Sequence, residues 1–476
     1  MTKEINKKKS WFVILLLLIT VTGGIIRFVN INYTSLWSDE LYSALLANPK
    51  NSWYEILYIQ RALQPPLYAL SLWVWVKIFA YNEFWIRLYT LIAGTACIAV
   101  SGYLGKKIHS SFLGILLAVI VAFNPTQIWF SLEARFYAFV YLFAAISLLL
   151  YWQLRFQEKS KSSNWLFFIK VIIDATLCYF HHFGIVFLFA MFLFDIALFI
   201  QRKNKMLFLK WIGGYALSAL LYLPWVLWAW PEAFKVKHYW LTETNVKEYL
   251  LFNFSYPMPI TLLCIFFIIL FFLFAINNKR YFLLPLICLV VTVIPVMYSY
   301  IRLPILESRF AMVMAPAVYA MIGIGCISFL SYISKSYWPM YKPSAIIPIL
   351  LLLFIAPGLY LSFINRDGLI KQPWREMGKW LRSQPDIDSV KVYSTGSYVK
   401  NKIDIDFYLA PGHSSTSVTE LKPGTDKKMY LVETNGAWKI PDSTLNTLHR
   451  SYNISEVKFN AGLVKFGDIY ICTLKK

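Results

Sequence analysis

The sequence predicts an all-α polytopic membrane protein that ends in a small α/β domain, and three observations support this prediction. Hydrophobic residues make up 58% of the 476 residues and charged residues only 15%, against about 25% charged in soluble domains. Long apolar runs recur from residue 11 to residue 362, and the segment after them is polar. The mean hydropathy of +0.54 for the whole chain agrees with a mostly membrane-embedded protein.

Eleven apolar runs have the length that a membrane-spanning helix needs, which is about 20 residues. The run 66–80 is shorter and carries Lys77 beside two tryptophans, so we expect a helix that lies in the membrane interface. We therefore expect about 11 transmembrane helices plus interfacial helices. The predicted spans are 11–29, 85–105, 112–131, 136–153, 164–181, 183–200, 208–230, 259–277, 281–300, 309–333 and 344–362.

Basic residues between the runs predict the orientation, because Lys and Arg accumulate in cytoplasmic loops. The N-terminus is placed in the cytoplasm by Lys3, Lys7, Lys8 and Lys9, and later clusters begin on the same side at Lys106, Arg155, Arg202, Lys279 and Lys335. We expect a multi-pass protein of the cytoplasmic membrane with an uncleaved first helix, since residues 1–30 contain no obvious small-residue cleavage site. The segments predicted to be extracytoplasmic are 30–84, 131–137, 231–258, 301–308 and 363–476.

The polar tail has the composition of a folded extracytoplasmic α/β domain. Two stretches, 374–383 and 443–451, favour helices. Their partners are four stretches rich in β-branched and aromatic residues, which predict strands at 390–395, 429–434, 456–461 and 468–474. The predicted domains are therefore a transmembrane domain at 1–362 and an α/β domain at 363–476.

Charge and cysteine content exclude several classes of site. The net charge of +21 does not predict nucleic-acid binding, because the basic residues lie between apolar runs instead of on one polar face. Five of the six cysteines lie inside apolar runs and none forms a CxxC pair. The sequence therefore offers no disulfide framework and no thiolate metal site.

Two adjacent carboxylates, Asp39 and Glu40, follow Ser38 in the first long external loop. Ser38 is a good helix N-cap, and acids at a helix start are stabilised by the helix dipole, so an ordinary helix start explains the pattern equally well. The functional interpretation is a general base that faces a cavity at the membrane surface.

Basic and aromatic residues occupy three other external connections between spans. Arg135 lies two residues before Tyr137 and could bind a phosphate through two hydrogen bonds. The alternative is an interfacial arginine whose side chain extends its charge to water. Arg309 is placed to meet a lipid phosphate, although an interfacial pair with Glu307 is the alternative.

The third connection carries His181 and His182. Adjacent helical histidines diverge by about 100°, so they do not predict a metal site, and we expect one of them to hydrogen-bond substrate. A histidine at the water boundary remains the alternative.

In this order, the stretches resemble the membrane glycosyltransferases of the GT-C fold. The similarity is greatest to the bacterial relatives of the dolichyl-phosphate-mannose protein mannosyltransferases and to the lipid A aminoarabinose transferase. It covers roughly residues 10–365, and the later Trp374-Arg375-Glu376 looks like relatives with an external C-terminal domain. The family's acidic pair matches Asp39-Glu40, and its PP-x-Y turn matches Pro65-Pro66-Leu67-Tyr68. The acid–aromatic–Arg segment matches Glu83 to Arg87, and the R-x-Y motif matches Arg135-Phe136-Tyr137. The basic-aromatic helix start matches Arg309-Phe310.

The resemblance implies transfer of a sugar from a polyprenyl-phosphate carrier to an acceptor hydroxyl, with inversion, on the outer side of the membrane. Asp39 matches the acidic residue that acts in the family as the general base or as the residue that orients substrate, and Glu40 would support it. The residues expected to bind substrate are Arg135, Tyr137, His181, His182, Arg309, Tyr68 and Glu83. The acceptor could be a protein, a lipid or a glycan.

The chain also departs from its relatives before the two prolines. The aminoarabinose transferases have a Glu-Lys pair there, whereas this chain has Leu63-Gln64, so an acidic metal ligand and a phosphate-binding lysine are missing. We therefore expect that no metal or other cofactor is required.

Two other functions fit a polytopic protein. A transporter or flippase of a lipid-linked sugar would show internal repeats and broken helices near the bilayer centre, and the sequence shows neither. A membrane polysaccharide ligase or polymerase usually concentrates its function in one large late external loop, whereas the loop at 301–308 is short.

Overall fold

The structure is a computed structural model, and it describes residues 2–61, 64–157, 163–233, 235, 245–254, 256–275, 277–336, 346–364, 372–395, 404–409, 413–434, 440, 442–461 and 464–475. It has two compact units. The helical unit comprises Met1–Phe28, Ser52–Leu72 and Leu88–Ser362, and the sheet unit comprises Val29–Asn51, Trp73–Arg87 and Phe363–Lys476. The segments Val29–Asn51 and Trp73–Arg87 thus belong to the same unit as the tail. The predicted domains, with one boundary after residue 362, do not include this grouping.

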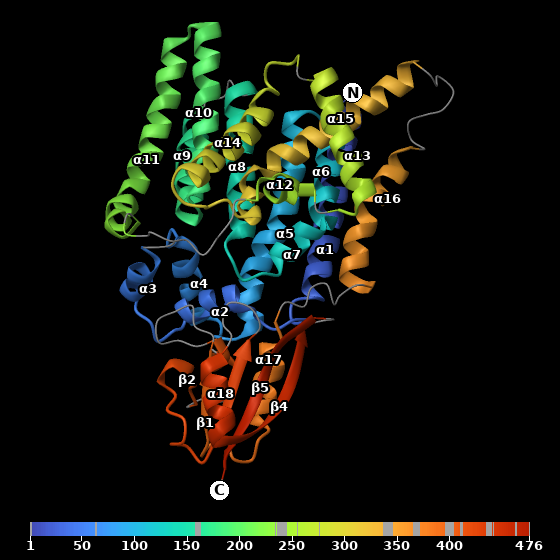
Figure 1. Cartoon of the computed structure of the whole chain (residues 1–476). Helices are drawn as coiled ribbons and strands as arrows, with labels where there is room; N and C mark the ends of the chain where they lie inside the picture. The colour runs from blue at the N-terminus through green and yellow to red at the C-terminus, as the bar shows by residue number, and fades with distance from the viewer. Residues whose placement is uncertain are drawn as a thin grey trace. The chain divides into compact units, whose positions relative to one another are not determined.

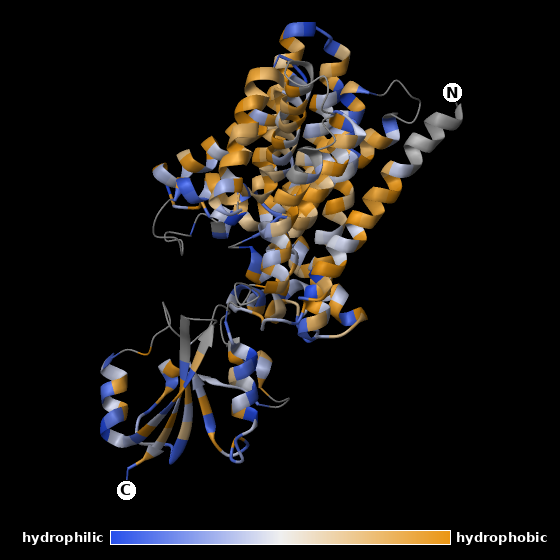
Figure 2. Cartoon of the chain, turned by 90° about the vertical axis from the view of Figure 1, so that its right-hand side faces the viewer, coloured by the Kyte–Doolittle hydropathy of each residue, from blue (hydrophilic) through white to orange (hydrophobic). Residues whose placement is uncertain are grey.

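The helices that lie mainly in the helical unit are apolar along most of their length (Figures 1 and 2). Eight helices in the described residues are long and apolar enough to cross a membrane, or nine if one bent pair is counted as a single span. The helices are α1 (Thr2–Phe28), α3 (Trp53–Gln60), α4 (Leu67–Ile78), α5 (Glu83–Ile108), α6 (Ser111–Phe123), α7 (Pro125–Ser131), α8 (Tyr137–Phe156), α9 (Ser163–Phe180), α10 (Phe183–Arg202), α11 (Lys205–Ala233), α12 (Val246–Leu251), α13 (Met258–Leu270), α14 (Leu283–Ile301), α15 (Ala315–Ser336) and α16 (Ile346–Leu359).

The chain therefore has the all-α multi-pass architecture that the sequence predicts. Within the described residues, each of the eleven predicted spans overlaps one or more helices. The ranges 164–181 and 344–362, which α9 and α16 occupy, are not among the eight helices or the bent pair. α4 has only 12 residues, about 18 Å of helix, and is too short to cross a bilayer core of about 30 Å.

The predicted span 112–131 is not one straight helix. α6 and α7 meet at a bend of 61°. Asn124 ends α6, and its side-chain oxygen accepts a hydrogen bond from the backbone N–H of Gln127 at 3.1 Å, so it also caps α7. Pro125 lacks the N–H that would continue the hydrogen-bond ladder, which explains the break at this position.

Helix α15 is the most enclosed candidate span, with 94% of its most apolar window buried. Its small residues allow close packing, as is common between membrane helices. A Cβ atom added at Gly325 would lie 1.9 Å from the carbonyl oxygen of Phe267 in α13, so these two helices touch backbone to backbone.

A network of charged side chains is buried among α8, α9, α10 and α11, at positions for which the sequence predicted no role. Lys170 pairs with Asp174 at 2.5 Å, and Arg155 pairs with Asp195 at 3.1 Å. The hydroxyl of Tyr215 donates to Asp195 at 2.8 Å. Two cations thus face two carboxylates, and this balance lowers the cost of placing ionised groups inside an apolar bundle.

The sheet unit contains a five-stranded mixed sheet in the order β2-β1-β3-β5-β4 (Figure 1). β1 is parallel to β2 and β3, and β5 is antiparallel to β3 and β4. The four predicted strands are confirmed, and β2 is an additional two-residue strand that is too short to leave a sequence pattern. The strands are β1 (Lys391–Ser394), β2 (Thr416–Ser417), β3 (Lys428–Thr434), β4 (Tyr452–Ala461) and β5 (Val464–Leu474).

Helices α17 (Trp374–Arg382) and α18 (Asp442–Ser451) pack on opposite faces of this sheet (Figure 1). Met429 and Leu431 of β3 pack in one core with Leu448 of α18. Tyr430, between them in sequence, meets Trp380 of α17 edge to face at 5.8 Å. Because successive side chains of a strand point to opposite faces, one face of β3 packs on α18 and the other on α17.

Candidate functional site

In the helical unit, three connections between helices bring together four of the residues expected to bind substrate. Arg135 and Tyr137 lie at the start of α8, and His181 lies between α9 and α10. Arg309 lies in the 3₁₀ helix η3 (Ser308–Met314) that precedes α15. The guanidinium carbon of Arg309 lies 5.6 Å from the centroid of the Tyr137 ring.

A stack of rings links the two arginines. The Arg135 guanidinium lies 5.2 Å from the Phe136 ring, which stacks on the His181 ring at 4.9 Å. The His181 ring lies 4.5 Å from that of Phe310, the residue after Arg309. Arg135 is 7% exposed and the Arg309 side chain 13%, so both charges lie in a partly dry region. The pair of Arg309 with Glu307 that the sequence left open is present, with Nε 3.6 Å from a carboxylate oxygen. An arginine in such a place interacts more strongly with a bound anion than one in water.

The two histidines have different environments. Nδ1 of buried His181 accepts a hydrogen bond from the backbone N–H of Phe183 at 3.2 Å, so a neutral His181 ring carries its proton on Nε2. His182 is exposed, and its Nδ1 pairs with the Tyr222 hydroxyl at 3.1 Å. The two rings lie 6.5 Å apart at 57°. Both histidines lie in the connection between α9 and α10, outside the helices, and of the two only His181 stacks on Phe136 and contacts Phe310.

Tyr68 lies in a buried aromatic group. Its hydroxyl is 3.2 Å from that of Thr90, and its ring meets those of Phe136 and Phe139 edge to face. The Tyr68 ring therefore packs against the Phe136 ring in this structure, and the expected contact of Tyr68 with substrate remains a prediction.

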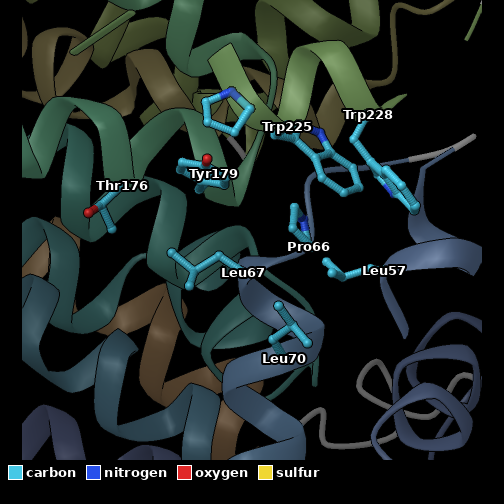
Figure 3. Close-up of a pocket in the computed structure, with 9 residues that line it drawn as sticks. Leu57, Pro66, Leu67, Leu70, Thr176, Tyr179, Trp225 and Trp228 are labelled. Carbon is cyan, nitrogen blue, oxygen red and sulfur yellow. The ribbon is translucent and has the colours of Figure 1, made fainter. Parts of the chain in front are cut away.

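An apolar cavity of about 470 Å³ lies in the helical unit between α3, α4, α9 and α11 (Figure 3). Pro66, from the double-proline turn, is one of the residues that line it. Tyr179 of the lining meets the ring of Tyr222, the partner of His182, edge to face at 5.0 Å. The cavity thus adjoins the histidine connection. Its lining is Leu57, Pro66, Leu67, Leu70, Thr176, Tyr179, Pro224, Trp225 and Trp228.

The turn before this cavity is described only in part. Leu63 lies outside the described residues, and Gln64 is half-buried. Arg61 pairs with Glu232 at 3.2 Å and lies over the ring of Tyr58.

In the sheet unit, Asp39 lies in the first turn of α2 (Ser38–Leu46) and is partly exposed. The N-cap is Trp37, whose backbone N–H donates to Glu40 at 3.2 Å, so the prediction of Ser38 as N-cap was wrong by one residue. The Ser38 hydroxyl instead donates to Gln372 at 2.8 Å. A contact from the tail thus replaces the local cap that the sequence pattern indicated.

Glu40 differs from its neighbour because it is only 1% exposed and held by Arg87. Nε of Arg87 donates to one carboxylate oxygen at 2.9 Å and Nη2 to the other at 2.7 Å. The same guanidinium donates to the carbonyl oxygens of Ile31 at 3.2 Å and Ser35 at 2.8 Å. Glu40 and Arg87 therefore fix the loop that carries Asp39, which fits the supporting role expected for Glu40.

Glu83 ties the same loop to the tail. One carboxylate oxygen accepts hydrogen bonds from the backbone N–H of Leu36 at 3.1 Å and from the hydroxyl of Tyr408. The other accepts from Arg375 at 2.8 Å. Burial and the adjacent Glu83 carboxylate raise the pKa of Tyr408 well above its ordinary value, which keeps the phenol protonated as a donor.

Sequence reasoning did not place Arg87, Gln372, Arg375 or Tyr408 in the site. Arg87 was visible in the acid–aromatic–Arg segment and Arg375 in the start of the tail. Gln372 and Tyr408 left no signal, because they act through tertiary contacts alone. No group of three or more His, Cys, Asp or Glu side chains in the described ranges is placed to hold a metal ion, and the expectation of a metal-independent reaction stays a prediction.

Comparison with known proteins gives matches only among solved structures, since no family model and no curated protein matches the chain. Apo ArnT from Cupriavidus metallidurans is similar over 98% of each chain, with a TM-score of 0.64 and 12% identity. The same protein bound to undecaprenyl phosphate matches over 97% of this chain and 98% of that one, with a TM-score of 0.59 and 12% identity. The apo oligosaccharyltransferase of Archaeoglobus fulgidus matches over 82% of this chain and 63% of its own, at 15% identity and a TM-score of 0.52.

These similarities show that the chain has the GT-C fold, including the C-terminal domain over the full length of ArnT. The prediction of the fold from the ordered motifs is confirmed. At 12% identity the likeness concerns the fold, and residue roles rest on the geometry above.

Proposed function

We propose that this protein is an integral membrane glycosyltransferase that moves a sugar from a polyprenyl-phosphate donor to an acceptor hydroxyl outside the cytoplasmic membrane. The observation that carries the proposal is the convergence of Arg135, Tyr137, His181 and Arg309 from three separate connections. Two partly dry guanidinium groups suit a phosphate that must leave as an anion. The match to ArnT bound to undecaprenyl phosphate supports a carrier of this class.

The apolar cavity suits the hydrocarbon part of such a donor. Pro66, Leu67 and Trp225 line it, and it adjoins the histidine connection that leads to the arginine cluster. An isoprenoid chain in the cavity would leave its phosphate free to reach Arg135 and Arg309. This arrangement explains why the enzyme is embedded in a membrane.

The proposed reaction is a single displacement. The acceptor oxygen forms a bond to the anomeric carbon while the bond between that carbon and the phosphate oxygen breaks, and the electron pair leaves with the polyprenyl phosphate. The acceptor proton passes to Asp39, and attack opposite the leaving group gives inversion. Arg309 and Arg135 stabilise the charge on the departing phosphate, and the proposed displacement is written without a metal.

The test is donor turnover by the purified protein in detergent. Radiolabelled polyprenyl-phosphate sugars are added one at a time with a membrane extract as the acceptor source, and binding and sugar release are measured separately. We expect one donor to be turned over, and Asp39→Asn to lower the rate by about 10²–10⁴ while donor binding persists. Asp388→Asn, the same change at a carboxylate of the sheet unit that is 85% exposed, is the matched control.

Arg309→Gln tests the phosphate contact in the same assay. Loss of a charge-assisted hydrogen bond worth about 1.5–3 kcal/mol should weaken donor binding by about 10–100-fold. Arg280→Gln, at an exposed arginine outside the cluster, should bind donor like the wild type. Turnover that survives in Asp39→Asn contradicts the assigned base, and binding of a donor that is never turned over favours transport of a lipid-linked sugar.

A further inference from the structure

The sheet unit contains a second candidate site, a cleft of about 310 Å³. Three consecutive residues at the start of α5, Asn82, Glu83 and Phe84, form one side. Asn32 of the first external loop and Arg375 of the tail complete it. Of its lining residues, Glu83 is expected from the resemblance to bind substrate, and the proposed reaction above assigns no step to the cleft.

The two charged residues that line the cleft balance each other. Arg375 and Glu83 pair at 2.8 Å, with side chains that are 19% and 17% exposed. Because the two charges neutralise each other, the cleft offers no net attraction for a phosphate or for a cation. A neutral polar ligand fits this lining better than an ion.

The rim carries groups that recognise hydroxyls. Asn32 and Asn82 are exposed, and each amide can both donate and accept a hydrogen bond. Oδ1 of Asn82 accepts from the backbone N–H of Trp85 at 3.1 Å, which fixes the orientation of this amide. Phe84 is half-buried and adds an aromatic ring to the lining. One oriented amide and a second exposed amide beside an aromatic ring suit a pyranose, which has hydroxyls at its edge and apolar C–H groups on its face.

The cleft is built on the loop that leads to Asp39. Two Arg375 nitrogens donate to the carbonyl oxygens of Asn32 at 3.1 Å and Thr34 at 2.7 Å. Glu83 accepts from the backbone N–H of Leu36, three residues before Asp39. A ligand in the cleft would therefore contact the segment that positions the proposed base.

We propose that this cleft binds a neutral sugar unit of the acceptor, so that the acceptor is a glycan or a glycan-bearing molecule. This proposal rests on the proposed transferase function, because only a transferase has an acceptor. The tail takes part because Arg375 supplies one wall and pairs with Glu83. The ligand class follows from a balanced charge pair, two amides and one ring, all within the sheet unit.

The test uses the full chain in detergent on an array of immobilised sugars. The probes are glucose, galactose, mannose, rhamnose and N-acetylglucosamine, each as the monosaccharide and as short oligomers. We expect the wild type to bind at least one neutral sugar series, and Asn32→Ala and Phe84→Leu each to weaken that binding at least tenfold. Lys50→Ala, an exposed residue of the same unit outside the cleft lining, should bind like the wild type. Size-exclusion profiles matching the wild type confirm that each variant is folded.

Failure of this inference is distinguishable from failure of the proposed function. Donor turnover by a wild type that binds no sugar on the array, or whose binding survives both cleft variants, overturns the cleft as a sugar site and leaves the transferase standing. Cleft-dependent sugar binding without turnover of any donor supports the sugar site and overturns the transferase.

Discussion

The buried pair of Glu40 and Arg87 gives the sharpest test of how the loop before Asp39 is held. The perturbation is a set of three variants: Arg87→Met, Glu40→Leu and the double variant. Methionine and leucine keep much of the side-chain volume while they remove the charges. The comparison therefore isolates the ion pair from packing.

The contacts of Arg87 and Glu40 set the expected loss of unfolding free energy in each variant. Arg87→Met leaves the Glu40 carboxylate, 1% exposed, without its counter-ion, which costs about 3–5 kcal/mol. It also removes the donors to the carbonyl oxygens of Ile31 and Ser35, at about 1–3 kcal/mol for each buried group left unpaired. We expect about 5 kcal/mol or more for Arg87→Met and about 3–5 kcal/mol for Glu40→Leu. The double variant should lose at least about 2 kcal/mol less than the sum of the two.

The assay is unfolding of the full chain in mixed micelles titrated with sodium dodecyl sulfate, followed by near-ultraviolet circular dichroism. Single variants that fold should also lose donor turnover, since Asp39 sits on the loop that the pair fixes. Two single effects that add to the double effect within about 0.5 kcal/mol would refute the coupling, because independent sites behave in that way. The loop would then be held by its other contacts, including those from Glu83 and Gln372.

Two further predictions concern packing and pH. Gly325→Ala should lower the stability and yield of the folded protein, because the added Cβ would lie 1.9 Å from the carbonyl oxygen of Phe267. The added Cβ of Gly213→Ala has no atom within 4 Å, so this variant should be neutral or stabilising by up to about 1 kcal/mol. Thermal unfolding in detergent compares the two variants. Hydrogen bonds from Lys428 and Tyr430 lower the pKa of Asp386, so its contribution to stability is present above the ordinary Asp pKa of about 3.9 and is lost as the pH falls through the lowered value. The difference in unfolding temperature between the wild type and Asp386→Asn should therefore be constant near neutral pH and shrink below about pH 4, and a difference that grows there would contradict the assignment.

The sheet unit changes the interpretation of the C-terminal segment. The tail folds around its own sheet, yet Gln372, Arg375 and Tyr408 all contact residues that come before residue 90. These contacts reach the loop that carries Asp39 and the helix start that carries Glu83. The tail is therefore packed in one unit with the segment that carries Asp39 and is more than an appended domain.

The sequence by itself determined the helices, the strands of the tail and the order of the motifs. Apolar run length sets the number of spans because each must cross the same hydrocarbon thickness, and alternation along β3 sets its two buried faces. Arg135, His181 and Arg309 were each visible as basic residues beside aromatic ones at predicted span ends. Local composition carries these signals, so no tertiary information was needed to find them.

Only the tertiary structure decided which of these residues meet. Glu40 pairs with Arg87, 47 positions away, and Glu83 pairs with Arg375, 292 positions away. Such pairings depend on which helix faces and loops pack together, and spacing along the chain does not encode that choice. The same limit explains the error at Ser38: its side chain could cap the helix locally, but Gln372 from the tail offered a competing hydrogen bond, and the fold made that partner available.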